Sequence, residues 1–151
     1  MVRLSTRLQR KDPSLPVYVV IPGRHVQPWG LTGTTVIEGT ANGVSFGRRT
    51  IKAWGKGADD WFVEFTAPFC KAAGFSVGDR IALELQIADA STPPGLEEIL
   101  SKSKHVAAAW LALSERERRD AGEYIRAAKA PATRERRAAA IAERLRGKPG
   151  R

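Results

Sequence analysis

Few residues of the types that perform catalysis or bind metals occur in this chain at a usable spacing. The two histidines, His25 and His105, lie far apart, and neither has a neighbour at the spacing of a zinc-ligand pair. Asp59 and Asp60 are adjacent, so on a strand their carboxylates would point to opposite faces and could not share a proton. We therefore predict no catalytic residue, no metal site and no cofactor.

Three further features have a structural explanation. The run Gly55-Lys56-Gly57 lacks the GxxxxGK[ST] spacing of a phosphate-binding loop, and we interpret it as a hairpin turn. Ser114 is followed three residues later by Glu117, the pattern of a capping box, so its hydroxyl is expected to cap a helix and not to act as a nucleophile. Cys70 is the single cysteine, which excludes an internal disulfide, and we expect it to pack in a core.

Positive charge is concentrated near the end of the chain. The formal net charge is +9, of which residues 1–100 contribute +1 and residues 101–151 contribute +8. Arginine side chains bind carboxylates and phosphates through paired N–H donors. On a helical projection Arg136, Arg137 and Arg144 flank a small alanine, and with Lys129 they form a candidate surface for an anionic ligand or a protein partner. A charge run that is only solvated is the commoner outcome for such segments.

Other residues of the same segment have predicted structural roles. Arg134 falls on the apolar side of its helix, so we expect it to donate hydrogen bonds to carbonyls at the end of helix 115–129. Thr133 is predicted to cap the helix in which it lies, and Gly147 to end that helix in a left-handed conformation.

Lys52 and Trp54 are a second candidate binding surface. If Ile51 and Ala53 point inward from a strand, Lys52 and Trp54 point outward, which places a cation and an aromatic ring together. The alternative, which we favour, is that Trp54 packs against the helices that follow and joins the two parts of the chain, because large aromatic residues usually serve burial.

The first 89 residues have the patterns of strands. Alternating or β-branched runs occupy 2–8, 17–21, 34–39, 44–54, 61–65 and 81–87. Asn42-Gly43 predicts a tight hairpin, and Thr66 is a plausible cap for a short helix ending at Gly74. Six strands with one short helix favour a small barrel over residues 1–89.

The last third of the chain has the 3.6-residue periodicity of helices. One helix begins after Thr92-Pro93-Pro94, another carries Val106 to Leu113, and Ser114–Gly147 reads as two helices joined at Ala130-Pro131. The apolar stripes of the last two helices are predicted to face a core; they are Ala121, Tyr124, Ile125 and Ala128, then Ala138, Ile141, Ala142 and Leu145. We therefore predict a helical unit of three to four helices over residues 90–151.

These residues resemble a known family. The pattern Pro94-x-Leu96-x-x-x-Leu100, the helix with Trp110, then Leu113-Ser114, Tyr124-Ile125-x-x-Ala128-Lys129 and Thr133-Arg134-x-Arg136-Arg137 is similar to the YdeI/OmpD-associated family. The front part, with Gly39-Thr40-x-Asn42-Gly43-x-x-Phe46 and Gly78-Asp79-x-Ile81, resembles the small β-barrel domain of unknown function that often precedes it. The resemblance implies a double-split β-barrel akin to AbrB-like proteins. It links the chain to bacteriocin protection and to a porin, but implies no biochemical activity.

The expected function is that of a cytoplasmic, non-enzymatic protein that binds an anionic ligand or a protein partner, as a monomer or homodimer. No apolar run reaches the roughly 20 residues of a membrane span, and the N-terminus lacks an apolar signal core. Nucleic-acid binding through the basic C-terminal helix is one alternative, suggested by a pI near 10.3 and by the AbrB-like resemblance. An enzyme acting on a small anionic substrate is the other.

Overall fold

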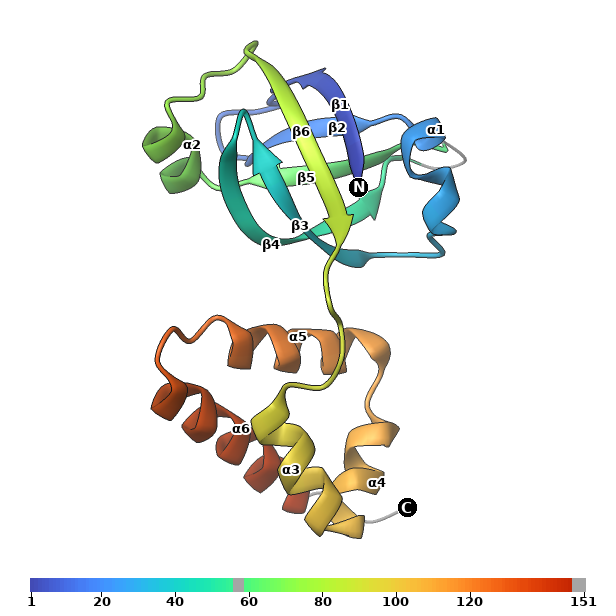
Figure 1. The fold of residues 1–151 in the computed structure, drawn as a ribbon, viewed down its shortest axis with the longest axis vertical. Coiled ribbons are helices and arrows are strands. Elements are labelled where there is room, and N and C mark those ends of the chain that lie inside the picture. The colour runs from blue at the N-terminus through green and yellow to red at the C-terminus, as the bar shows by residue number, and fades with distance from the viewer. Residues whose placement is uncertain (56–58, 148–151) are drawn as a thin grey trace. The chain divides into compact units, whose positions relative to one another are not determined.

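The alternating pattern of the first part of the chain forms six strands in the computed structural model, which describes residues 1–55 and 59–147 (Figure 1). The chain divides into two units, Met1–Asp89 and Ala90–Arg151. Each unit has its own buried apolar cluster. The expected turn at Gly55-Lys56-Gly57 lies largely outside the described residues.

The first unit is one antiparallel sheet that curls into a nearly closed barrel, with the strand order β1-β6-β3-β4-β5-β2. The two edge strands meet, because Thr6 Oγ1 of β1 donates a hydrogen bond to the carbonyl of Val20 on β2 at 3.0 Å. The strands are β1 (Val2–Arg7), β2 (Val17–Ile21), β3 (Thr35–Ala41), β4 (Val44–Ala53), β5 (Trp61–Phe65) and β6 (Arg80–Ile87).

Strand register follows from the apolar alternation. Leu4 lies opposite Leu83, and Thr6 lies opposite Ile81, so the apolar residues of β1 and β6 share the inner face. The predicted hairpin at Asn42-Gly43 is present, with φ of 48° and 78° at these residues. Asn42 Oδ1 also accepts a hydrogen bond from the backbone N–H of Ala82 at 2.7 Å, which ties the hairpin to β6.

Two details of the barrel differ from the prediction. Besides the expected helix α2 (Ala67–Ala73), which Thr66 caps through the N–H of Phe69, there are a short helix α1 (Gly23–Val26) and a 3-10 turn η1 (Gln27–Trp29). The expectation of one short helix was therefore wrong, because segments of three and four residues have no apolar periodicity to reveal them. Ala53 is exposed and does not point inward, whereas Ile51 is fully buried.

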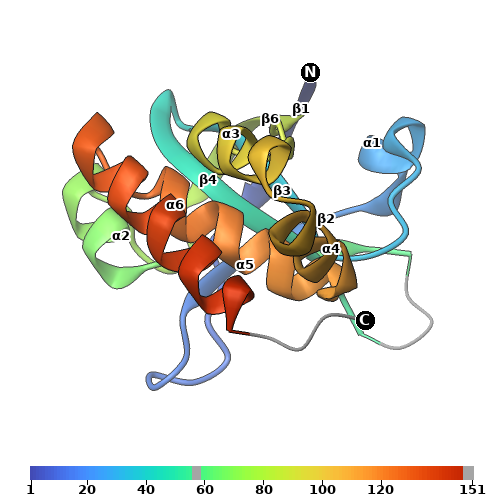
Figure 2. The same ribbon diagram turned by 90° about the horizontal axis from the view of Figure 1, so that it is seen from below.

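The second unit contains α3 (Pro94–Lys102), α4 (Lys104–Ala112), α5 (Glu115–Arg126) and α6 (Pro131–Arg146). Figure 1 and Figure 2 show α5 and α6 side by side, and α6 also packs against α3 and α4. Its buried core consists of Leu96, Val106, Trp110, Ile125, Ala138, Ile141, Ala142 and Leu145. The six strands and the following helices confirm the predicted class, mainly β with α.

The ends of α5 and α6 are built differently. Ser114 Oγ accepts from the N–H of Glu117 at 3.1 Å while Glu117 Oε1 accepts from the N–H of Ser114, so both bonds of a capping box are present. Helix α6 instead begins at Pro131 without a side-chain cap. Thr133 is therefore not a cap, because the helix already begins two residues earlier, at Pro131. Proline suits a first helical position, since it has no backbone N–H that needs a partner and its φ is already helical.

The end of α6 and the position of Tyr124 also differ from the prediction. Gly147 has φ −76°, a right-handed conformation, so the expected left-handed cap is absent. The ring of Tyr124 is 46% exposed and does not join the core stripe that buries Ile125. Within the described residues, no helix is both long and apolar enough to cross a membrane.

Candidate functional site

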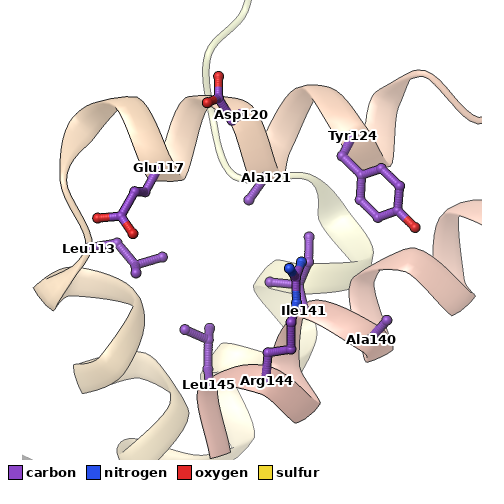
Figure 3. A pocket seen from close by; sticks show the side chains of 9 residues that line it. All are labelled: Leu113, Glu117, Asp120, Ala121, Tyr124, Ala140, Ile141, Arg144 and Leu145. Carbon is purple, nitrogen blue, oxygen red and sulfur yellow. The ribbon is translucent and has the colours of Figure 1, made fainter. Parts of the chain in front are cut away.

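A groove lies between α5 and α6 in the helical unit (Figure 3). Its volume is about 620 Å³, within the range of roughly 300–1,000 Å³ typical of small-ligand sites. The short side chains of Ala121 on α5 and Ala140 on α6 leave the space open. The remaining lining residues are Leu113, Glu117, Asp120, Tyr124, Ile141, Arg144 and Leu145.

The α5 wall is one stripe of that helix. Glu117, Ala121 and Tyr124 follow at intervals of four and three residues, which places them on one face along about 10 Å of helix, and Leu113 lies just before the helix begins. The α6 wall combines the buried side chains of Ile141 and Leu145 with the exposed side chains of Ala140 and Arg144. The base of the groove is therefore apolar, and its rim is charged.

The charged groups at the rim are not equally available. Glu117 Oε1 accepts the capping hydrogen bond from Ser114 N–H at 3.1 Å, and the carboxylate of Asp120 lies 3.9 Å from Arg116 Nε. Arg144 forms no hydrogen bond or ion pair with the described part of the chain. Figure 3 shows its guanidinium directed into the space between the helices, while Asp120 projects from the opposite side of α5.

Arg137 is engaged with Tyr124 of α5. Its Nη1 donates to the carbonyl oxygen of Tyr124 at 2.7 Å, and its guanidinium lies 4.5 Å from the centre of the Tyr124 ring. A guanidinium at the C-terminal end of a helix also stabilises the helix dipole. Arg137 therefore joins α6 to α5 and is not an open ligand-binding group, in contrast to its place in the predicted surface.

The other basic residues predicted for this region also differ in whether they bond to the backbone or are exposed. Arg134 Nη1 donates to the carbonyl oxygens of Ala128 and Lys129 at 3.0 Å and 2.9 Å. Arg136 is exposed and donates to the hydroxyl of Thr133 at 3.1 Å. Lys129 is exposed but does not line the groove. Of the four predicted binding residues, Arg144 is the one that lines the groove between α5 and α6.

The second predicted surface, Lys52 and Trp54, is an aromatic cluster on the barrel. Trp54 stacks on Tyr18 with ring centres 5.0 Å apart and meets Phe62 edge to face at 5.4 Å. Lys11 Nζ lies 4.9 Å from the centre of the Trp54 ring, and Lys52 pairs with a neighbouring carboxylate, that of Glu64, at 3.6 Å. The rings and charged groups of this cluster therefore interact with one another within the barrel unit.

A smaller cavity of about 500 Å³ lies beside α1 in the barrel, a feature that the sequence did not reveal. Asp60 Oδ1 accepts from the N–H of Gly23 at 3.1 Å, which fixes the start of α1. A Cβ atom on Gly23 would lie 2.0 Å from the carbonyl oxygen of Asp59, so this close approach requires glycine. The lining residues are Gly23, Arg24, Val26, Gln27, Gly30, Leu31, Asp59 and Trp61.

Reactive and metal-binding side chains form no cluster. Among the described residues, no three of the His, Cys, Asp and Glu side chains are grouped to hold a metal ion. His105 Nε2 lies 3.3 Å from the carbonyl oxygen of Arg146. Burial raises the pKa of the Cys70 thiol, an effect that nearby Arg49 opposes. Arg49 itself lies over the rings of Phe65 and Phe69, and burial lowers its pKa.

Residues 89–147 match the model of a family described as "Bacteriocin-protection, YdeI or OmpD-Associated". The helical unit is thus similar to the YdeI/OmpD-associated family. All lining residues of the α5–α6 groove, from Leu113 to Leu145, lie within the matched region. The match confirms the predicted family and does not include the barrel. No curated protein and no solved structure gives a significant match to the chain.

Proposed function

We propose that this protein is a cytoplasmic, non-enzymatic binding protein whose ligand or partner occupies the α5–α6 groove of the helical unit. The observation that carries the proposal is the guanidinium of Arg144, which has no hydrogen-bond or ion-pair partner among the described residues, beside an apolar cavity of about 620 Å³. Concave, mostly apolar sites with a few convergent polar groups are where proteins bind ligands.

A binding role accounts for the groove better than catalysis does. A general acid or base must be free to exchange a proton with a substrate. Both carboxylates of the groove already have partners on α5, Glu117 with the N–H of Ser114 and Asp120 with Arg116. The family description, with its reference to bacteriocin protection, supports a role in protection or stress, which we extend to this chain as part of the proposal.

Nucleic-acid binding is the second candidate, favoured by the net charge of +8 over residues 101–151. Two arginines of α6 donate to backbone carbonyls, Arg134 to Ala128 just after α5 and Arg137 to Tyr124 on α5, which reduces the cations available for phosphates. If Lys129, Arg136 and Arg144 nevertheless contact about four phosphates, affinity for an oligonucleotide should fall roughly 100-fold between 50 and 200 mM salt. Fluorescence anisotropy with mixed DNA and RNA oligomers measures this; no binding at low salt would exclude the candidate.

The binding proposal is tested by NMR titration of the isotope-labelled full chain with indole and cyclohexanol, two neutral probes of different shape. We expect chemical-shift changes at the amides of α5 and α6 that line the groove. Ala140→Trp should block these changes, because Ala140 is exposed at the rim and a large ring there fills the cavity. Ala139→Trp is the matched control, since Ala139 is exposed on α6 but does not line the groove. Shifts elsewhere, or an Ala140→Trp variant that responds like the native chain, would contradict the proposal.

A further inference from the structure

We propose that the α5–α6 groove binds a small amphiphilic monocarboxylate, a molecule with one carboxylate and an apolar body. This inference rests on the proposed function and specifies the chemical class of the ligand.

The charge of the ligand follows from the groups that face the groove. Arg144 points into it without a partner among the described residues, as Figure 3 shows. A guanidinium presents two parallel N–H donors that match the two oxygens of a carboxylate. An anionic group at this position would gain a charge-assisted bond that no residue of the described chain supplies.

The number of charges on the ligand is limited by the opposite wall. Glu117 also lines the groove from α5, and its carboxylate is exposed. A second negative charge on the ligand would lie near this carboxylate and be repelled. The groove therefore favours a monoanion over a polyphosphate or a nucleic-acid backbone.

The apolar part of the ligand follows from the base of the groove. Ile141 and Leu145 are almost fully buried, and Leu113 and Ala121 are partly buried next to them. A ligand body that contacts their remaining surface removes apolar area from water, which is favourable in proportion to that area. The α5 wall from Glu117 to Tyr124 is about 10 Å long, which matches a linear aliphatic chain of about eight carbons.

The test compares octanoate, octan-1-ol and octylamine by NMR titration of the full chain, with carboxyl-labelled octanoate as a second readout. We expect octanoate to bind in the groove about tenfold or more tightly than octan-1-ol, because only octanoate pairs with Arg144. Arg144→Gln should remove this preference while leaving the affinity for octan-1-ol within about twofold. Arg136→Gln is the matched control and should change neither affinity, because Arg136 lies on the same helix but outside the groove.

Each other result overturns the inference and has a distinct meaning. Equal binding of octanoate and octan-1-ol would show that the charge of Arg144 does not affect affinity, and tighter binding of octylamine would show that the carboxylate of Glu117 dominates. Binding of indole or cyclohexanol without octanoate would leave the proposed function standing and refute the ligand class. If dilution of the protein alone shifts the groove amides, the occupant is a second copy of the chain. If none of these probes shifts the groove amides, both proposals fail.

Discussion

Arg134 on α6 donates a hydrogen bond from Nη1 to the carbonyl oxygen of Ala128, at 3.0 Å, just beyond the last turn of α5. The same nitrogen also reaches the carbonyl oxygen of Lys129 at 2.9 Å. Carbonyls that follow the end of a helix have no intrahelical partner, so Arg134 provides a hydrogen bond to two backbone groups of the α5–α6 connection. The loop between α5 and α6 is thereby held from the side of α6.

Arg134→Gln should therefore destabilise the helical unit by about 1–2 kcal/mol, because glutamine does not reach both carbonyls and carries no charge. Urea unfolding followed by the indole NMR signal of Trp110, a residue of the helical core, measures the change. Arg136→Gln is the control and should stay within about 0.5 kcal/mol, as expected for an exposed side chain. Equal effects of the two substitutions would show that the carbonyl contacts of Arg134 contribute nothing specific.

Ser114→Ala should cost about 1 kcal/mol, since it removes the hydroxyl that caps the N–H of Glu117. Thr133→Ala tests the corrected start of α6 by the same measurement. It should change stability by less than about 0.5 kcal/mol, because Pro131 and not Thr133 begins the helix. A loss at Thr133 as large as that at Ser114 would restore Thr133 as a capping residue.

The contact between Arg137 and Tyr124 can be separated into two parts by a double-mutant cycle. Tyr124→Leu removes the ring but leaves the backbone carbonyl that accepts the hydrogen bond from Arg137. The coupling between Tyr124→Leu and Arg137→Gln therefore reports the cation–π contact, which we expect to be about 0.5–1 kcal/mol at this half-exposed site. Urea unfolding of the four chains provides the value, and a coupling near zero would show that only the carbonyl bond matters.

Cys70 should react slowly with iodoacetamide at pH 8, because its side chain is buried, 8% exposed, and burial raises its pKa. The thiol pKa is higher in the folded than in the unfolded chain. The contribution of the protonated thiol to stability is therefore complete below the unfolded pKa of about 8.5 and decreases as pH rises through the folded pKa.

The stability difference between the native chain and Cys70→Ala should accordingly shrink from pH 8 to pH 10. Urea unfolding of both chains at each pH measures it, and the alkylation rate in urea provides the reference for a free thiol. Fast labelling of the folded chain at pH 8 would contradict the burial of Cys70.

The amino-acid sequence by itself determines the six strands and the larger helices of this protein, and the similarity of its helical unit to a family. Alternation along 2–8 and 81–87 specifies which face of β1 and β6 is buried, because side chains in a strand project alternately. The capping box at Ser114 and the hairpin at Asn42-Gly43 are equally local, since each depends on residues within three positions of one another.

The tertiary structure alone decided which arginines of α6 are available. A helical projection does not distinguish Arg136, Arg137 and Arg144. Whether each guanidinium is bonded or open depends on the residues of α5 that lie opposite it. The Tyr124 ring and carbonyl occupy Arg137, whereas Ala121 leaves a space in front of Arg144. Periodicity specifies the face of one helix, but a groove exists only where the side chains of a second helix are too short to fill it.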